Sequence, residues 1–348
     1  NSLAKHYNSQ ICLFWRNLKD QTFDYRKIEE QFDFKPSYIV KEDMGFLKWM
    51  KEIWKKLNSS HPDIVLGSEF GISTIIIILH KFVTKSHYKI VIINDDSYDM
   101  LVNNNQFTKR HARAVKAMMP LVDDVINVEP RVAAYNQQKY QKGIYFPIIC
   151  NDVIAKKRLE RVLPISQNYV SKYQLEGKKV LLFVGRLVVL KNVKFALRAF
   201  IKANLDNTIF VIVGDGPEKE KLEKIAAGNP AVIFTGRLEG DELYAWYNVG
   251  QVFTLPSYKE PFGAVTNEAL VAGCKVLISK DAGSNCLVKD GKNGYIIDPH
   301  HETKFIEKLK LAFYSMKPLK MQLVVKENMM VSSFEEHIKS LYARMENL

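Results

Sequence analysis

The chain of 348 residues is long enough for two domains of ordinary size, and its 47% hydrophobic and 25% charged residues are typical of a globular protein. It has no run of eighteen or more apolar residues, which argues against a membrane-spanning helix, and its start shows no signal-peptide pattern. The net charge of +12 is spread over both halves without a long Lys/Arg tract. This distribution argues against a nucleic-acid stripe and favours an anionic small substrate or an anionic membrane surface.

The first half of the chain alternates short apolar runs with helical patterns. The runs are rich in Val, Ile and Phe and nearly continuously apolar, which is typical of strands buried on both faces of a parallel sheet. They are residues 10–15, 36–40, 63–67, 89–94, 124–128 and 144–149. With the helical patterns between them they predict serial β-α units and therefore a doubly wound domain.

A basic amphipathic helix is predicted over residues 45–57, where Trp49, Trp54 and other apolar residues recur at helical spacing with lysines between them. Such a helix packs on its own sheet or lies in a membrane interface. Together with the basic segment 109–116, it favours a contact with an anionic membrane.

The second half repeats the strand and helix alternation after a polar join near residues 163–179. The predicted strands are residues 179–185, 208–214, 231–236, 251–256, 275–279 and 294–298. Most of the 17 glycines of the chain lie in this half. Because glycine lets the backbone approach a phosphate closely, the second half is the expected nucleotide binder.

Two loops that follow predicted strands of the second half suit phosphate binding. Gly185 ends one strand, and Arg186 and Lys191 follow it, so that a fork of donors and a point charge would clamp a diphosphate. Gly214 and Gly216 form a tight turn after the next strand. Each loop alone is equally consistent with an ordinary solvated loop or turn. A third loop, with Arg237 and Leu238 after a strand, would place backbone groups beside a base edge, or it is a plain strand-helix connection.

The fourth loop holds two glutamates, Glu260 and Glu268, on either side of a predicted helix start. A helix over residues 262–271 would expose free N–H groups at its amino end, which suits an anion. These groups belong to Phe262, Gly263, Ala264 and Val265. A carboxylate accepts from two hydroxyls, so Glu260 suits a sugar and Glu268 suits a ribose. One ligand satisfies all four loops, namely a nucleoside-diphosphate sugar.

Residues 179–298 resemble the nucleotide-sugar-binding domain of glycosyltransferase family 4 (glycosyl transferases group 1), retaining enzymes of the GT-B fold. The resemblance rests on the stretches FVGRLVVLKNV, VGDGPEKEKLEK and NGYIID and on the Glu-x7-Glu signature from Glu260 to Glu268. It implies an α/β chain with two doubly wound Rossmann-like domains that face a central cleft. It also implies roles for the site residues: Arg186 and Lys191 on the phosphates, Glu268 on the ribose, Glu260 and the Phe262–Gly263 backbone on the donor sugar. No divalent metal is expected, because the two cations replace it.

The first half is similar to the family's acceptor domain only in outline. Family members carry a His-Asp pair after the fourth strand, and the matching position here reads Asn94–Asp95. Asp95 is the nearest polar candidate for the contact with the donor sugar, and His111 is the alternative. Residues 94–96 also suggest a metal-binding acid pair, which we do not assign because it lies far from the four loops. The family's first strand and glycine-rich loop lie upstream of the chain or are absent.

The sequence thus predicts an acceptor-side domain over residues 1–168, a nucleotide-sugar-binding domain over 169–331 and a C-terminal helix, 332–348, that crosses back. The expected activity is retaining, metal-independent transfer of a hexosyl group from a UDP- or GDP-sugar to a hydroxyl of a saccharide or lipid-linked acceptor, in surface polysaccharide or glycolipid synthesis. No cofactor and no nucleic-acid partner are expected, and the location is the cytoplasm, at the inner face of the cell membrane. Another GT-B enzyme such as an epimerase or phosphorylase, or a non-catalytic nucleotide-sugar-binding subunit, remains an alternative.

Overall fold

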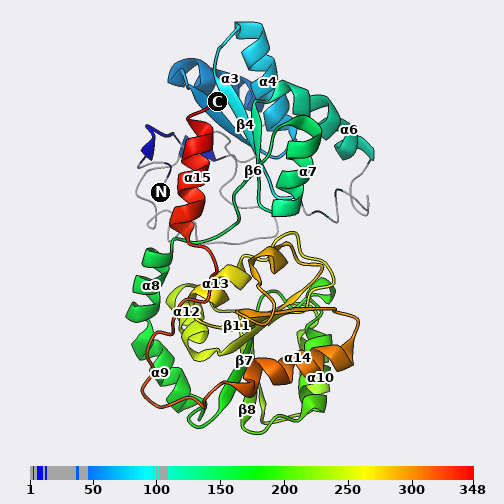
Figure 1. The fold of residues 1–348 in the computed structure, drawn as a ribbon, viewed down its shortest axis with the longest axis vertical. Coiled ribbons are helices and arrows are strands. Elements are labelled where there is room, and N and C mark those ends of the chain that lie inside the picture. The colour runs from blue at the N-terminus through cyan, green and yellow to red at the C-terminus, as the bar shows by residue number, and fades with distance from the viewer. Residues whose placement is uncertain are drawn as a thin grey trace.

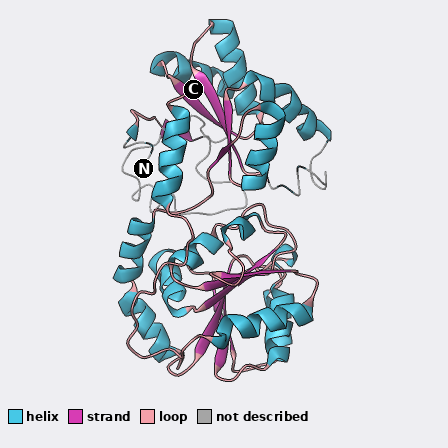
Figure 2. Cartoon of the chain, viewed as in Figure 1, coloured by secondary structure: helices cyan, strands magenta, loops and turns pink. Residues whose placement is uncertain are grey.

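The computed structural model describes residues 46–96 and 109–348, together with residues 3, 6–10, 12, 13, 37, 38, 98 and 101. Two α/β units lie one above the other, and the last helix of the chain runs back to the first unit (Figure 1). Each unit has a parallel sheet with helices on both of its sides (Figure 2).

The first unit contains a parallel sheet in the order β3-β4-β5-β6. Its strands are β3 (Ile64–Ser68), β4 (Lys89–Asn94), β5 (Asp124–Asn127) and β6 (Ile144–Tyr145), and its helices are α3 (Phe46–Ser60), α4 (Ile72–Thr84), α6 (Lys109–Met118) and α7 (Pro130–Tyr140), with the 3-10 turn η1 (Met119–Leu121). Two short strands, β1 (Cys12–Leu13) and β2 (Ser37–Tyr38), pair with each other in parallel. Every apolar run predicted to be a strand in this half contains or overlaps one.

The second unit contains a six-stranded parallel sheet in the order β12-β11-β10-β7-β8-β9. The strands are β7 (Lys179–Val184), β8 (Thr208–Val213), β9 (Val232–Gly236), β10 (Val252–Leu255), β11 (Lys275–Ser279) and β12 (Gly294–Ile297). The chain moves outward from β7 in one direction and, after β9, from β10 in the other. The point where the strand order reverses therefore lies between β7 and β10, which is where open α/β sheets bind ligands.

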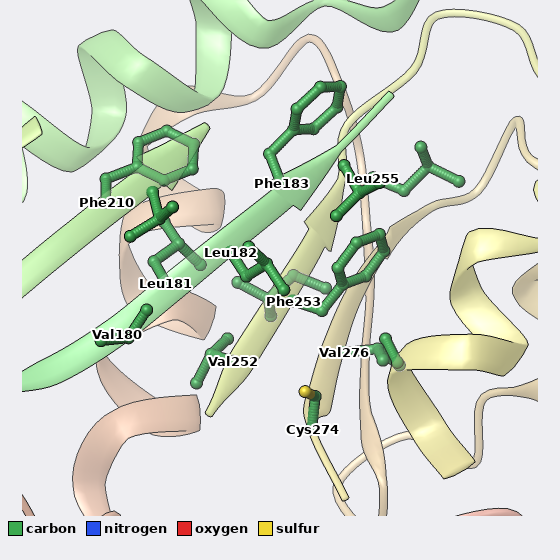
Figure 3. Packing of buried hydrophobic residues seen from close by; sticks show 14 of the residues in the cluster. Val180, Leu181, Leu182, Phe183, Phe210, Val252, Phe253, Leu255, Cys274 and Val276 are labelled. Atoms are coloured by element: carbon green, nitrogen blue, oxygen red, sulfur yellow. The ribbon is translucent and has the colours of Figure 1, made fainter. Parts of the chain in front are cut away.

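Helices and short turns connect these strands in chain order. They are α8 (Asp152–Arg161), α9 (Leu163–Lys172), η2 (Val189–Lys191), α10 (Val193–Ala203), α11 (Lys219–Ala226), α12 (Gly240–Val249), α13 (Val265–Val271), η3 (Gly283–Leu287) and α14 (Glu302–Tyr314). One large apolar core lies on this sheet, with side chains such as Phe183, Phe210 and Phe253 fully buried (Figure 3). Each such burial contributes roughly 1.5–3 kcal/mol, so the sheet is a stiff platform for its loops.

The connection between the units follows β6. Helix α8 precedes the expected domain boundary at residues 168/169, and the boundary falls inside α9. Both helices pack on α12, and Ala155, Leu159 and Val170 belong to the core of the second sheet. By packing, α8 and α9 therefore go with the second unit, because their apolar faces are buried there.

The last helix, α15 (Phe334–Met345), packs on the first unit after the chain has crossed back (Figure 1). Ile338 and Leu341 are buried beside Val91 of β4. Arg344 donates from Nε to the buried Asp124 carboxylate at 2.9 Å, which ties the end of the chain to the start of β5.

Candidate functional site

Four loops at the carboxyl edge of the second sheet are joined by backbone hydrogen bonds. Leu187 N–H, after β7, donates to the carbonyl of Asp215, after β8, at 2.8 Å. Gly214 N–H donates to the carbonyl of Gly236, at the end of β9, at 2.9 Å. Tyr258 N–H, after β10, donates to the carbonyl of Leu190 at 2.9 Å. The loops predicted from the sequence to share one ligand therefore form one continuous surface.

Two glycines permit this close approach of the loops. A Cβ on Gly214 would lie 1.9 Å from the carbonyl oxygen of Gly185, and a Cβ on Gly216 would lie 2.5 Å from that of Leu187. Gly214 and Gly216 also have φ values of +150° and +153°, which L side chains rarely adopt. The turn therefore requires glycine at both positions for steric as well as conformational reasons. The helix after it, α11, begins at Lys219, with Glu218 as its N-cap.

Lys191 and Glu260 meet at the point where the strand order reverses. Lys191 closes η2 after β7, and its ammonium forms an ion pair with the Glu260 carboxylate in the loop after β10. Both side chains are largely shielded from solvent. Arg186, in the same loop after β7 as Lys191, is exposed, and no acidic side chain of the described part of the chain pairs with it. The site thus contains one cation neutralised by its neighbour and one that is open to an anionic ligand.

The helix after Glu260 begins later than the sequence predicted. Instead of starting at Phe262, α13 begins at Val265, and Gly263 has a φ of +92°. The chain makes this extra bend because Gly263 packs against Leu255 and Ser284, where a Cβ would be only 2.6 Å from Leu255 Cδ2. Among the hydrogen bonds between described residues, none uses the backbone N–H groups of residues 262–265. These donors belong to the bend before α13 and to the first residue of that helix. Ala264 is exposed, whereas Phe262 is buried.

Glu268 lies in the first turn of α13 rather than two turns into it. Its carboxylate already has two donors from α12: Tyr247 donates to Oε2 at 2.7 Å and Tyr244 donates to Oε1 at 3.3 Å. Burial raises the pKa of Glu268, whereas the two tyrosine hydrogen bonds and the nearby Arg158 guanidinium lower it. Half of the accepting capacity of the carboxylate is therefore in use, and the predicted contact of Glu268 with a ribose must use the other half.

The third loop contributes an exposed guanidinium and a packed side chain. Arg237 pairs with Glu239 two residues later, with Nε 3.0 Å from Oε1. Leu238 packs partly on the core of the second sheet. The Gly214 N–H donates to the Gly236 carbonyl at the start of this loop, so the loop lies beside the turn predicted to bind phosphate. It follows β9, which is an edge strand of the sheet.

The first unit also collects polar groups at the carboxyl ends of its strands. Asn94, at the end of β4, is buried, and Asp95 after it is exposed. Glu129, after β5, has a fully buried carboxylate that accepts from Arg131 and from the N–H of Tyr98 at 2.5 Å. The side chain of His111, the alternative to Asp95, lies outside the described residues.

The two carboxyl edges meet across the junction between the units. The Tyr145 hydroxyl, at the end of β6, donates to Cys286 Sγ in η3 at 3.8 Å, and Cys150 N–H donates to Asn267 Oδ1 on α13 at 2.8 Å. Burial raises the pKa of both the Tyr145 hydroxyl and the Cys286 thiol, the latter to about 11. Figure 1 shows the loops of the second sheet pointing toward the first unit.

Several functional candidates were missed by the reasoning from sequence. Tyr244 and Tyr247 are three residues apart on α12, a spacing that places both on one helix face, but only the fold brings Glu268 to that face. Glu129 was missed because nothing in the sequence separates a buried carboxylate from a solvated one.

Comparison with known proteins agrees with this architecture. Residues 166–329 match the family model described as "Glycosyl transferases group 1". The structure of Anabaena HepE in complex with UDP superposes with a TM-score of 0.73 at 15% identity, covering 93% of this chain and 89% of that one. The apo structure of the lipopolysaccharide outer core galactosyltransferase WaaB gives a TM-score of 0.65 at 17% identity, covering 97% and 90%.

The fold is GT-B.

Among sequence relatives, the sulfoquinovosyl transferase SQD2 of Arabidopsis thaliana is 36% identical over 136 residues, which is 38% of this chain. The alignment spans 26% of the length of that plant protein. The family model lies within residues 166–329, whereas the likeness to solved structures covers 93% and 97% of the chain and so extends over both units.

None of the helices that the structure describes is both long and apolar enough to cross a bilayer. In the same part of the chain, no group of three or more His, Cys, Asp or Glu side chains is arranged to hold a metal ion.

Proposed function

We propose that this protein is a retaining glycosyltransferase that moves a sugar from a nucleoside-diphosphate sugar, with uridine or guanosine as the base, to an acceptor hydroxyl. The observation that carries the proposal is the Lys191–Glu260 pair at the strand-order reversal of a GT-B second unit, in loops that also contain Arg186 and the unused N–H groups of residues 262–265. The match of residues 166–329 to the glycosyl transferases group 1 model supports it.

The proposed donor pose follows from the charges. A pyrophosphate carries negative charge that Arg186 and Lys191 attract, and backbone N–H groups at the bend before α13 donate to its oxygens. To bind it, Lys191 exchanges the Glu260 carboxylate for a phosphate oxygen. Glu260 is then free to accept from two hydroxyls of the donor sugar.

The chemical step separates a sugar carbon from the diphosphate, so negative charge grows on the leaving phosphate. Groups that are already in place where charge develops lower the barrier most. Lys191, Arg186 and the N–H groups have that position in the proposed pose. They supply the positive charge that a divalent ion supplies elsewhere, so we propose metal-independent transfer, to be checked by activity in excess chelator.

The acceptor is proposed to bind at the carboxyl edge of the first sheet, opposite the donor. Asp95 is exposed there and is our candidate for the contact with the donor sugar. Synthesis of a surface polysaccharide or glycolipid fits the names of two similar proteins, a sulfoquinovosyl transferase and a lipopolysaccharide outer core galactosyltransferase.

Thermal unfolding with added nucleotides tests the donor proposal directly. A ligand at about 100 times its dissociation constant stabilises the folded state by about 2.7 kcal/mol. We expect UDP or GDP to raise the melting temperature and the matching monophosphate to raise it much less, because it lacks the second phosphate. Nucleotide release from the corresponding sugar donor, and the anomeric form of the product, then test transfer and retention. No shift with either diphosphate would contradict the proposal.

Contact with an anionic membrane is the second part of the proposal, and we assign it to α4 rather than to α3. The apolar face of α3 packs on the first unit: Ile53 is buried, and Trp54 lies edge-on to His80 of α4. A stripe of apolar side chains is exposed along α4, with Phe82 84% exposed. The stripe consists of Ile72, Ile75, Leu79, Phe82 and Val83. Lysines of the neighbouring α3 suit anionic lipid headgroups.

Vesicle sedimentation tests this contact. We expect the protein to bind phosphatidylglycerol vesicles more strongly than phosphatidylcholine vesicles and Phe82→Ser to weaken that binding several-fold. Tyr314→Ser, which removes a 90% exposed aromatic from α14 of the other unit, is the matched control and should change nothing. Equal binding to both kinds of vesicle, or equal binding by wild type and Phe82→Ser, would contradict the contact.

A further inference from the structure

The carboxylate of Glu268 is held at both of its oxygens. Tyr247, which is fully buried, donates to Oε2 at 2.7 Å, and Tyr244 donates to Oε1 at 3.3 Å. A carboxylate has about four lone-pair positions, two on each oxygen. One position on each oxygen therefore remains for other donors, and the plane of the carboxylate is fixed by the two hydroxyls already bound.

The two tyrosines are themselves held in place by their surroundings. The guanidinium of Arg158 lies 3.7 Å above the centroid of the Tyr244 ring and donates from Nε to Asp241 at 3.4 Å. Tyr247 packs between Tyr244 and Phe253, with ring centroids 5.8 Å and 6.3 Å away. Helices α8, α12 and α13 thus meet around one acidic group, which neither a core contact nor a surface ion pair explains.

We propose that Tyr244 and Tyr247 are positioning residues that orient Glu268 to accept from the two neighbouring hydroxyls of a ribose, and so set a preference for ribonucleotides over 2′-deoxyribonucleotides. This inference rests on the proposed nucleotide site. Two free lone pairs on the two oxygens of one fixed carboxylate match a vicinal diol, whereas a single hydroxyl leaves one of them without a donor. A hydrogen bond to a charged group accounts for about tenfold or more in affinity.

The same clamp keeps Glu268 in its accepting form. The titratable and charged groups facing the carboxylate are Tyr244, Tyr247, Arg158 and Cys150. Burial raises the pKa of Glu268, and the tyrosine hydroxyls oppose that rise. Removing the Tyr247 hydroxyl therefore raises the pKa of Glu268 further. Only the ionised carboxylate accepts from both hydroxyls. As the pH is lowered, the variant should therefore lose its remaining ribose preference at a higher pH than the wild type does.

The test compares binding of UDP, 2′-deoxy-UDP, GDP and 2′-deoxy-GDP by calorimetry. We expect wild type to prefer the ribose form of the bound nucleotide by about tenfold or more, Tyr247→Phe to lose most of that preference, and Tyr244→Phe to lose less of it because its bond is longer. Tyr169→Phe removes a hydroxyl that contacts the carbonyl of Glu242 on the same helix α12, and this matched control should keep the full preference.

The outcomes separate this inference from the proposed function. An unchanged ribose preference in both Tyr244→Phe and Tyr247→Phe, with wild-type pH dependence, would overturn the positioning role and leave the diphosphate site standing. Equal wild-type affinity for the ribose and deoxyribose forms would do the same. If wild type binds none of the four nucleotides, the proposed function and the clamp both fail. Tyr244→Phe keeps the test valid if Tyr247→Phe unfolds, which its melting temperature will show.

Discussion

The carboxyl edges of the two sheets differ in how their loops are built. At the edge of the second sheet, Gly214 and Gly216 let three loops touch through backbone hydrogen bonds, and Lys191 meets Glu260 at the strand-order reversal. At the edge of the first sheet the polar groups are side chains such as Asp95 and Glu129. Backbone contacts there, such as Val128 N–H to the Asn94 carbonyl at 3.3 Å, join the residue after one strand to the last residues of the neighbouring strand.

This difference explains why one unit was recognisable from its sequence and the other was not. A site made from backbone groups needs glycines at fixed places, and glycines leave a pattern in the sequence. A site made from side chains on strand ends changes with its ligand and leaves no fixed pattern. In the proposed function, the nucleotide is the common part of the substrate pair, and the acceptor is the part that varies.

The largest effect is expected from removing the Lys191 ammonium at the carboxyl edge of the second sheet. Lys191→Ala should lower turnover by about a hundredfold or more, the typical loss for one group that stabilises developing charge. It should also weaken binding of the nucleoside diphosphate. Lys194→Ala, three residues on and exposed at the start of α10, is the matched control. Steady-state kinetics with the sugar donor and calorimetry with the diphosphate measure the two effects.

A substitution at the carboxyl edge of the first sheet tests whether the two edges have different roles. Asp95→Ala should leave the affinity for the diphosphate as in wild type, because Asp95 belongs to the other unit and faces the sugar in the proposed pose. Wild-type turnover in Lys191→Ala, or loss of diphosphate binding in Asp95→Ala, would contradict the assignment of the diphosphate to the second sheet and of the acceptor to the first.

An intermediate effect is expected from glycine replacement at equivalent places in the two units. Gly214→Ala should lower the free energy of unfolding by about 2 kcal/mol, because its Cβ would lie 1.9 Å from the Gly185 carbonyl oxygen and its φ is +150°. Gly71→Ala, at the loop after β3, meets nothing within 4 Å and has a φ of −104°, so less than about 1 kcal/mol is expected. Urea unfolding measures both changes, and equal losses would show that the close approach at Gly214 is not required.

The smallest effect concerns the return of the chain to the first unit. Arg344→Ala removes the partner of the buried Asp124 carboxylate, which still accepts from the N–H groups of Val125 and Gly143. Because the arginine side chain is 47% exposed, we expect a loss of only about 1 kcal/mol in the free energy of unfolding. Lys339→Ala, which breaks an exposed pair with Glu335, should change it by less than about 0.5 kcal/mol. A larger loss from Lys339→Ala than from Arg344→Ala would contradict the stabilising role of the Arg344–Asp124 ion pair.

The strands were predictable because they are buried on both faces of parallel sheets. Such strands are continuous apolar runs, and each of the runs predicted in the second half contains a strand, from β7 to β12. The four loops were found because each follows a strand and carries glycine or charge. Local pattern is sufficient for these features, since both the strand and the loop after it are encoded within about ten residues.

The remaining details depend on groups that are distant in the sequence. Lys191 and Glu260 are 69 residues apart, so their ion pair requires the strand order that places β7 beside β10. The later start of α13 depends on how Gly263 packs on Leu255 and Ser284. The tyrosine clamp requires α12 and α13 to lie side by side. Helix α8 precedes the polar join at residues 163–179 and α9 lies within it, yet the apolar faces of both helices pack on the second unit.

The most direct test of the proposed diphosphate site is a crystal structure of the protein with UDP or GDP, whichever raises its melting temperature. In the proposed donor pose the Lys191–Glu260 pair is broken, and the phosphate oxygens lie about 2.7–3.2 Å from Lys191 Nζ and from at least one N–H nitrogen of residues 262–265. A diphosphate bound elsewhere, with Lys191 still on Glu260, would contradict it.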